Sequence, residues 1–289
     1  MKKIKKFIEY YFLIIFFFIL NFFPIDLVSL LGGKIFKIIG PLTNSHKTAI
    51  SNYKKIFQNL DNKSIRQDIL KSWENLGKTF IELSILNKLL NKKNNRIKLL
   101  GEENIKKIKK NNQQVIFFGI HQGNWELLVP TISKLGIDVG AIYRHINNPL
   151  IDKLILEKRN ITIKDSKTFY TPKGKESAKE IIKAINDKLS IILLIDQKDS
   201  AGENIKFFGI DAKTQLGFLK IARKYKCNLM PVQMTREKNN NFLITFHSPI
   251  NIFEKDINDT DAMIKIHSII ESWIKENPTQ WFWQHSRFN

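Results

Sequence analysis

A histidine and a glutamate stand close together at His121 and Glu126, directly after the apolar run 115–120. The run has the length and composition of a short buried strand. His121 therefore falls where this predicted strand ends, and Glu126 falls at the start of an amphipathic stretch. In α/β proteins such a strand-to-helix corner tends to hold the residues that bind ligands and perform chemistry.

The two side chains are suited to proton transfer. A neutral imidazole, with an unperturbed pKa of about 6.5, can accept a hydroxyl proton at neutral pH. We expect Glu126 to hold the other ring nitrogen of His121, which would fix the tautomer and stabilise the imidazolium. Such a pair suits the attack of an alcohol on a carbonyl. The same spacing also occurs by chance in polar turns, so it does not by itself decide between a dyad and a turn.

Short apolar segments alternate with amphipathic ones over the second two thirds of the chain, while the stretch from about 45 to 92 has apolar residues at helical spacing. The predicted strands are 96–100, 115–120, 139–143, 191–195, 229–235 and 242–246, and the predicted helices are 124–135, 149–158, 175–187, 214–226 and 260–275. This alternation predicts an α/β fold with a mostly parallel central sheet flanked by helices.

The N-terminus carries four lysines within its first six residues, followed by an aromatic and aliphatic run. Its uninterrupted apolar part, 10–20, is shorter than the roughly 20 residues that span a bilayer. No small-residue cleavage site follows it, which disfavours a signal peptide. We therefore predict an N-terminal membrane anchor over 1–40, in which 27–39 is interfacial, and a catalytic domain over 41–289. Whether the first segment spans the bilayer or lies in its interface is left open.

The formal net charge of +20 favours anionic partners such as acidic proteins or anionic lipids. Abundant lysine, isoleucine and asparagine are also typical of an AT-rich genome. The single Cys227 excludes an intrachain disulfide and a multi-cysteine zinc site. No helix-turn-helix, zinc-finger or RNP-like motif is visible, so nucleic acid is not an expected partner.

The segment from His121 to Glu126 resembles the histidine–four residues–acid motif of glycerolipid acyltransferases. Its flanks narrow the resemblance to the late acyltransferases of lipid A biosynthesis, of the lauroyl or myristoyl type, in the lysophospholipid acyltransferase superfamily. The matching segments, which extend over essentially the whole chain, are Tyr143-Arg144, 148–152, Arg159, Ile195-Asp196-Gln197, Phe207-Phe208-Gly209, Thr214 with Gly217, and 277–288.

Two departures accompany this resemblance. Ser286 stands where the family usually has an arginine, which puts the role of a paired-arginine terminus in doubt. The residues between His121 and Glu126 differ from those of some members, and we expect such differences to bear on acceptor or chain-length selection.

The resemblance implies transfer of a fatty acyl chain from acyl carrier protein to a hydroxyl of a lipid A precursor of the Kdo-lipid IVA type, in lipopolysaccharide biosynthesis. It implies a glycerol-3-phosphate acyltransferase-like fold, no cofactor and no metal. It also implies a place at the bacterial inner membrane, with the catalytic domain on the cytoplasmic side. The expected partners are acyl carrier protein, the anionic lipid A precursor and the membrane surface.

Several residues acquire expected roles from this match. His121 would be the general base, with Glu126 orienting it. Arg159 would anchor a phosphate or stabilise the thioester oxyanion, since a guanidinium offers five donors in a fixed fork. Arg144, at a strand end beside Asn148, would position the same anionic head group. Asp196 ends an apolar strand, so it should lie at the carboxyl edge of the sheet beside His121, where it would order Arg159 or the loop.

Two other activities remain as alternatives. The chain could acylate another glycolipid or a lysophospholipid, because the sequence separates these acceptors poorly. A metal-dependent hydrolase would use His121, Glu126 and Asp196 as ligands. No second histidine lies nearby with ligand-like spacing, since His145 falls in a polar turn, and this disfavours the hydrolase.

Overall fold

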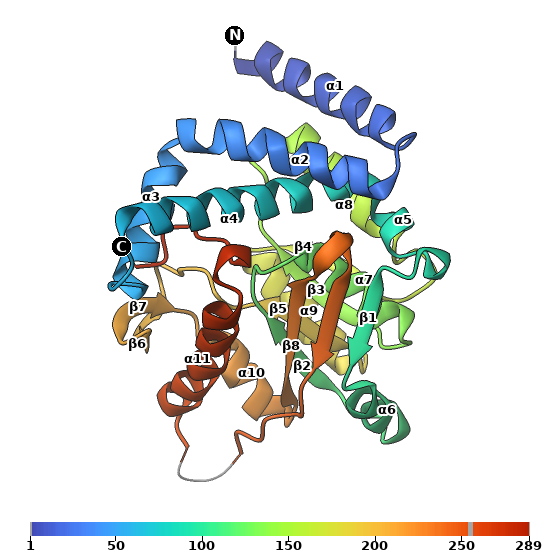
Figure 1. Ribbon diagram of the computed structural model, residues 1–289. Coiled ribbons are helices and arrows are strands. Elements are labelled where there is room, and N and C mark those ends of the chain that lie inside the picture. The colour runs from blue at the N-terminus through green and yellow to red at the C-terminus, as the bar shows by residue number, and fades with distance from the viewer. Residues whose placement is uncertain (1, 254–256, 289) are drawn as a thin grey trace.

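The computed structural model describes residues 2–253 and 257–288, and a seven-stranded sheet forms its centre (Figure 1). The strands lie in the order β1-β9-β8-β2-β5-β3-β4. Five adjacent strands, from β8 to β4, run parallel, whereas β9 pairs antiparallel with β8 and parallel with β1. Their bounds are β1 Ile97–Leu100, β2 Val115–Gly119, β3 Val139–Tyr143, β4 Phe169–Pro172, β5 Ser190–Leu194, β8 Asn228–Arg236 and β9 Phe242–Phe246.

Helices cover both faces of this sheet. One face packs against α6 (Glu102–Lys110), α7 (Leu128–Lys134) and α8 (Pro149–Ile161), and the other against α9 (Lys175–Asn186), α10 (Gly217–Tyr225) and α11 (Asp259–Glu276). Alternate residues of β2 enter the two cores: Phe117 packs with the α7 side, and Ile116 packs with the α9 and α10 side. Burial on both faces explains why the strand is apolar without alternation.

The predicted α/β fold with a mostly parallel central sheet is confirmed. All six predicted strands are present, with bounds that differ by at most one residue. Helix α6, the edge strand β4 and the hairpin β6 (Glu203–Phe207) with β7 (Ile210–Thr214) were not predicted. The hairpin turns through Phe208 and Gly209, which have φ values of 54° and 72°, as in a two-residue turn of type I′. The hairpin was not predicted because Phe208 occupies the first turn position, where Asn, Asp or Gly is typical of this turn.

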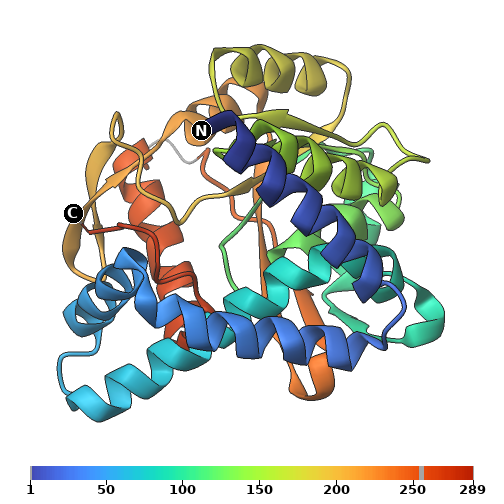
Figure 2. The same cartoon turned by 90° about the horizontal axis from the view of Figure 1, so that it is seen from above.

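The N-terminal third is helical, as predicted, and lies across one end of the sheet (Figures 1 and 2). Its helices are α1 (Lys2–Leu20), α2 (Ile25–Ile39), α3 (Asn44–Ile56), α4 (Asn62–Glu82) and the short α5 (Leu86–Leu89). Helices α2 and α4 pack closely through Gly32 and Gly77, where a Cβ on Gly32 would lie 2.6 Å from the Gly77 carbonyl oxygen. Any larger residue at either position would push these helices apart.

Helix α1 packs against the body of the protein along one side only. Leu13, Phe17 and Leu20 are buried in the same hydrophobic core as β2 and α7. Its other side exposes large apolar residues, among them Phe12, Ile15 and Phe18. Within residues 2–253 and 257–288, no helix combines the length and the apolar character that a membrane crossing requires.

Candidate active site

His121 and Asp196 meet at the carboxyl edge of the sheet. Strands β2 and β5 are parallel neighbours, so the chain leaves both of them at the same edge, and His121 and Asp196 each follow two residues after a strand end. The His121 Nδ1 donates to Asp196 Oδ1 over 2.7 Å, and the backbone N–H of His121 donates to Asp196 Oδ2 over 3.1 Å. The predicted position of Asp196 beside the histidine is therefore confirmed.

The Asp196 carboxyl is 2% exposed and accepts a third hydrogen bond, from the Trp281 indole at 2.8 Å. Burial opposes its ionisation, but the nearby His121 ring and these three hydrogen bonds outweigh it and hold the pKa of Asp196 below its usual value. A carboxylate at Nδ1 requires the proton on that nitrogen. The Nε2 of His121 is then the basic atom, and its neighbour is the Gln197 amide nitrogen at 3.3 Å.

The prediction that Glu126 orients the His121 ring is wrong, because Asp196 occupies that position. Glu126 instead receives two parallel hydrogen bonds from Arg159, Nε to Oε2 at 2.7 Å and Nη2 to Oε1 at 2.6 Å. Asp196 was expected to order Arg159 or the loop, and the first of these is wrong because Arg159 binds Glu126. Asp196 instead holds the backbone N–H of His121, directly after β2. Both side chains of the Glu126–Arg159 pair are largely buried, at 9% and 15% exposure.

The Glu126–Arg159 pair is held in its charged form. Burial favours the neutral carboxyl, but the guanidinium of Arg159 outweighs it and lowers the pKa of Glu126. Two aromatic rings flank Arg159, with the centroids of Tyr143 and Tyr170 at 5.6 and 5.7 Å from its guanidinium carbon. Glu126 takes the Nε and Nη2 donors, so Nη1 can still donate to a ligand.

Most of the residues between His121 and Glu126 face the protein interior. Gln122 is fully buried and donates to the Trp273 carbonyl oxygen at 2.9 Å, and Asn124 is fully buried as well. Trp125, by contrast, lines the neighbouring cavity. We expected the residues between His121 and Glu126 to bear on the choice of acceptor or chain length. Of Gln122, Asn124 and Trp125, only Trp125 lines the cavity and can contact a substrate there.

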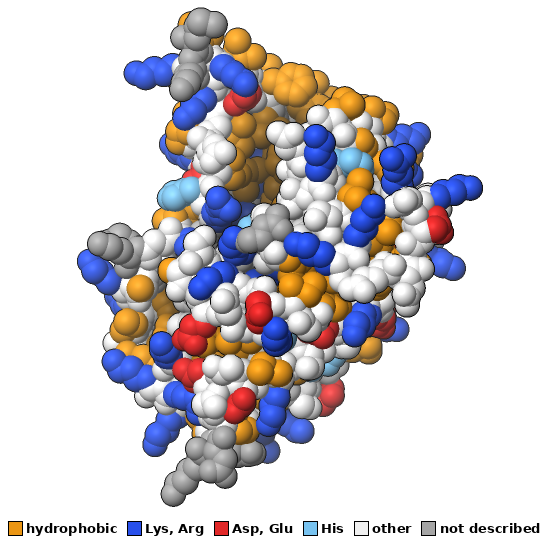
Figure 3. Space-filling model, turned by 90° about the vertical axis from the view of Figure 1, so that its left-hand side faces the viewer, with side chains coloured by type: hydrophobic (Ala, Val, Ile, Leu, Met, Phe, Trp, Pro, Cys, Tyr) orange, Lys and Arg blue, Asp and Glu red, His pale blue; other side chains and the backbone are white. Residues whose placement is uncertain are grey.

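A cavity of about 880 Å³ opens beside His121, and Glu126 and Arg159 also line it. Its walls are mainly apolar and come from both faces of the sheet: Leu128 and Ala141 on one face, and Ile181 and Phe218 on the other. Figure 3 shows a hollow with hydrophobic walls on this side of the molecule, with Lys and Arg side chains around it. The volume lies in the range typical of small-molecule sites.

The other two predicted substrate-binding residues, Arg144 and Asn148, lie in different surroundings. Arg144 is exposed and lines the cavity, together with Lys173 and Lys198, so it can meet an anionic ligand there. Asn148 is buried outside the cavity lining: its Oδ1 caps α8 by accepting from the Leu150 N–H, and its Nδ2 donates to the Lys6 carbonyl oxygen and to Glu9. The structure thus places Asn148 against α1, outside the cavity that Arg144 lines.

The C-terminal segment supports the site, and residue spacing alone gave no sign of this. The Phe282 N–H donates to the His121 carbonyl oxygen at 3.0 Å, next to the Trp281 bond to Asp196. Arg287 is fully buried and binds the Lys213 carbonyl oxygen and the Thr214 hydroxyl of β7. Arg287 therefore ties the C-terminal segment to the β6–β7 hairpin.

In the part of the chain that the structure describes, no three histidine, cysteine or acidic side chains are arranged to hold a metal ion. The oxygens of Glu126 are bonded to Arg159, and those of Asp196 to His121 and Trp281. These contacts do not assemble the three ligands that a hydrolase would require. The site instead offers a basic nitrogen, a fixed cationic donor and an apolar cavity, which together suit the transfer of a hydrophobic acyl group to a hydroxyl.

Comparison with known families agrees with this chemistry. No curated protein matches the chain at a significant level. The family model described as "Bacterial lipid A biosynthesis acyltransferase" matches residues 1–289. The match covers the site residues, the cavity and the N-terminal helices alike, so the chain belongs to the bacterial lipid A biosynthesis acyltransferase family.

Proposed function

We propose that this acyltransferase moves a fatty acyl chain from acyl carrier protein to a hydroxyl of a lipid A precursor of the Kdo-lipid IVA type. The observation that carries the proposal is the basic Nε2 of His121, fixed by the buried Asp196 carboxylate at the edge of a large apolar cavity. The family match supports acyl transfer in lipid A biosynthesis. The acyl carrier protein donor and the lipid A precursor are those that the family resemblance implies, and the catalytic roles are inferred from the site.

The reaction proceeds by direct attack of the acceptor on the donor. His121 Nε2 removes the hydroxyl proton as the oxygen bonds to the thioester carbonyl carbon, and Asp196 stabilises the imidazolium. Arg159 Nη1 donates to the developing oxyanion. When the intermediate collapses, the carbon–sulfur bond breaks and the thiolate takes the proton from His121. Cys227 has no part in this route, because it is buried and its burial raises the pKa of the thiol.

Charge around the cavity is suited to anionic substrates. Arg144, Lys173 and Lys198 line it, and the whole chain has a formal net charge of +20. Lys173 pairs with Asp199 at 3.0 Å, so part of this charge is already balanced. Acyl carrier protein is acidic, and a lipid A precursor carries phosphates and sugar carboxylates. Complementary charge of this kind raises association rates and weakens with added salt.

Mass spectrometry of lipid A from a strain that lacks this gene tests the acceptor. We expect lipid A with one acyl chain fewer than in the parent strain, and restoration by the wild-type gene but not by a His121→Ala variant. A lipid A with its full complement of acyl chains would exclude the proposed acceptor. A change confined to another glycolipid or a phospholipid would assign the enzyme to that acceptor instead.

Replacing Asp196 with asparagine is expected to lower kcat roughly 10²–10⁴-fold while the protein stays folded. The amide keeps the size of the side chain, but it has no charge to stabilise the imidazolium and can present a donor to Nδ1. A Trp281→Phe variant is the matched control, because it removes another hydrogen bond to Asp196 and leaves the His121 contact in place. The roles of Asp196 would need revision if both variants lost kcat equally in a steady-state acyl transfer assay.

We further propose that α1 and α2 lie in the cytoplasmic interface of the inner membrane, with the catalytic domain on the cytoplasmic side. Exposed apolar residues follow one side of α1, with Phe12 69% and Phe18 64% exposed, and Lys3 and Lys5 are exposed at its start. This combination is typical of helices that bind an anionic lipid surface.

A Phe12→Ser/Phe18→Ser variant should bind phosphatidylglycerol-containing vesicles at least about tenfold more weakly than the wild type, since burying one such ring is worth roughly 1.5–3 kcal/mol. Co-sedimentation at low and high salt measures this. A Leu100→Ser variant, which removes an exposed apolar residue from β1, should bind like the wild type. Unchanged binding by the double variant would remove α1 from the membrane contact. Binding that does not weaken with salt would remove the lysine contribution.

A further inference from the structure

A buried carboxylate lies behind the catalytic motif and is saturated with hydrogen bonds. Glu82, at the end of α4, is fully buried. Its Oε1 accepts from the Ser29 hydroxyl at 2.6 Å and from Arg236 Nη1 at 2.7 Å. Its Oε2 accepts from Asn124 Nδ2 at 2.6 Å and from Arg236 Nη2 at 2.8 Å. Two oxygens thus receive four donors, three of them from outside the catalytic motif.

Asn124 links this carboxylate to the site. Its Nδ2 donates to Glu82, and its Oδ1 accepts the backbone N–H of Glu126 at 3.2 Å, which begins the short helical turn at Trp125. The side chain therefore has one end held from behind and the other end on the turn that places Glu126 at the cavity. Neither Glu82 nor Asn124 lines the cavity itself.

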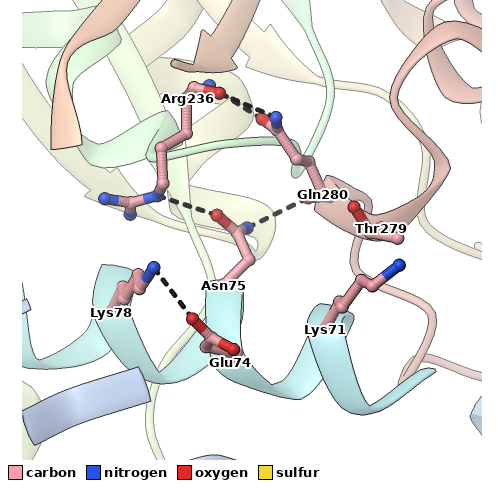
Figure 4. Close-up of a pocket in the computed structure, with 7 residues that line it drawn as sticks. All are labelled: Lys71, Glu74, Asn75, Lys78, Arg236, Thr279 and Gln280. Atoms are coloured by element: carbon pink, nitrogen blue, oxygen red, sulfur yellow. Dashed lines mark hydrogen bonds and ion pairs between the residues drawn. The ribbon is translucent and has the colours of Figure 1, made fainter. Parts of the chain in front are cut away.

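The residue before Asn124 is held in the same way. The Gly123 carbonyl oxygen accepts from Thr79 at 2.8 Å and from Asn75 at 3.1 Å, and its N–H donates to the Gln280 carbonyl oxygen. Figure 4 shows Asn75, Arg236 and Gln280 converging from α4, β8 and the C-terminal segment. Gly123 has a φ of 60°, so this backbone conformation favours glycine.

We propose that Glu82 is a positioning residue for acyl transfer, which acts through Asn124 on the turn that presents Trp125 and Glu126 to the cavity. The inference rests on the proposed function of the site. The Glu82 carboxylate fixes which way the Asn124 amide is turned. Its Oε2 can only accept a hydrogen bond, so it binds Nδ2 of Asn124. This leaves Oδ1 of Asn124 facing the backbone N–H of Glu126. Arg236 fixes the carboxylate in turn through its two parallel hydrogen bonds.

A reciprocal exchange of groups tests the proposal. Glu82→Gln brings an amide donor against the donors of Asn124 and Arg236, whereas Asn124→Asp brings two carboxylates together. The double variant Glu82→Gln/Asn124→Asp again pairs an amide donor with a carboxylate and keeps the net charge of the wild type. Ser29→Ala is the matched control, because it removes a hydrogen bond to Glu82 from α2 and leaves the motif untouched.

Steady-state acyl transfer, with thermal unfolding of the same samples, provides the readout. Each single variant in the pair should lower kcat at least about tenfold, equivalent to 1.4 kcal/mol, with little change in KM for the acyl donor. The double variant should recover part of the lost kcat, because it restores the pairing with residue 124 while the donor conflict with Arg236 remains. Ser29→Ala should lower the unfolding temperature and leave kcat within about twofold of the wild type.

Two results would overturn the proposal. One is a double variant whose kcat is no better than that of the worse single variant. The other is a Ser29→Ala protein in which the loss of kcat, relative to the loss of stability, is as large as in Asn124→Asp. If Glu82→Gln fails to fold, the proposal is tested by comparing kcat and the unfolding temperature of Asn124→Asp and Asn124→Ala with those of Ser29→Ala. A wild-type protein without acyl transfer would instead contradict the proposed function, which separates the two failures.

Discussion

A His121→Ala enzyme should lose about 10²–10⁴-fold in kcat for acyl transfer, because general-base catalysis typically contributes that much. Nε2 is the atom that accepts the hydroxyl proton in the proposed reaction. Among the described residues, its hydrogen-bonding neighbour is the amide of Gln197, which is not a base. Binding of the acyl donor should change little, as the apolar walls remain. Steady-state kinetics with a lipid A precursor and an acyl carrier protein donor measures both quantities.

The matched control is His145→Ala. His145 also lines the cavity and also pairs with a carboxylate, Asp152, at 2.6 Å. It has no catalytic role in the proposed reaction, so this variant should keep kcat within about threefold, less than the smallest effect of removing a general base. Near wild-type turnover by His121→Ala would remove that histidine from the mechanism.

Breaking the Glu126–Arg159 pair is expected to cost both stability and turnover. Removing one partner of a buried pair leaves the other charge uncompensated, which typically costs about 3–5 kcal/mol. Glu126→Gln and Arg159→Gln should each lower the free energy of unfolding by an amount of this order, and each should reduce kcat. Urea unfolding and steady-state kinetics on both variants provide the two readings.

The double variant Glu126→Gln/Arg159→Gln separates the structural from the catalytic role. It should regain much of the stability, because no unpaired charge remains, while kcat stays low because the cationic donor is absent. Lys173→Gln is the control for an exposed pair, since 60% of the Lys173 side chain is exposed and its loss should cost less than about 1 kcal/mol. Recovery of kcat together with stability would make the Glu126–Arg159 pair purely structural.

The strand pattern predicted which edge of the sheet holds His121 and Asp196. Continuous apolar runs predicted buried parallel strands, and parallel strands end at one edge, so His121 and Asp196 were expected to be neighbours. The sheet order confirms this neighbourhood, with β2 beside β5. The position at this edge follows from local composition and the geometry of parallel sheets, whereas the choice of these two residues for the site came from the family resemblance.

The partner of each side chain could not be predicted in this way. His121 and Glu126 are close in sequence, but a tight turn separates them, and each finds its partner on another element: Asp196 after β5 and Arg159 on α8. Such pairings depend on tertiary packing, which residue spacing does not record. Asn148 was expected to act together with Arg144 because the two are close in sequence. In the structure it caps α8 and contacts α1 instead.

One reconstituted reaction tests the central claim most directly. Purified protein is mixed with a tetra-acylated lipid A precursor and with acyl carrier proteins that carry acyl chains of different lengths. Mass spectrometry then measures the masses of the lipid products. We predict a product heavier than the precursor by one acyl chain, formed by the wild type and reduced about 10²–10⁴-fold in His121→Ala. Precursor of unchanged mass with every donor, or equal product from both proteins, would contradict the proposed reaction.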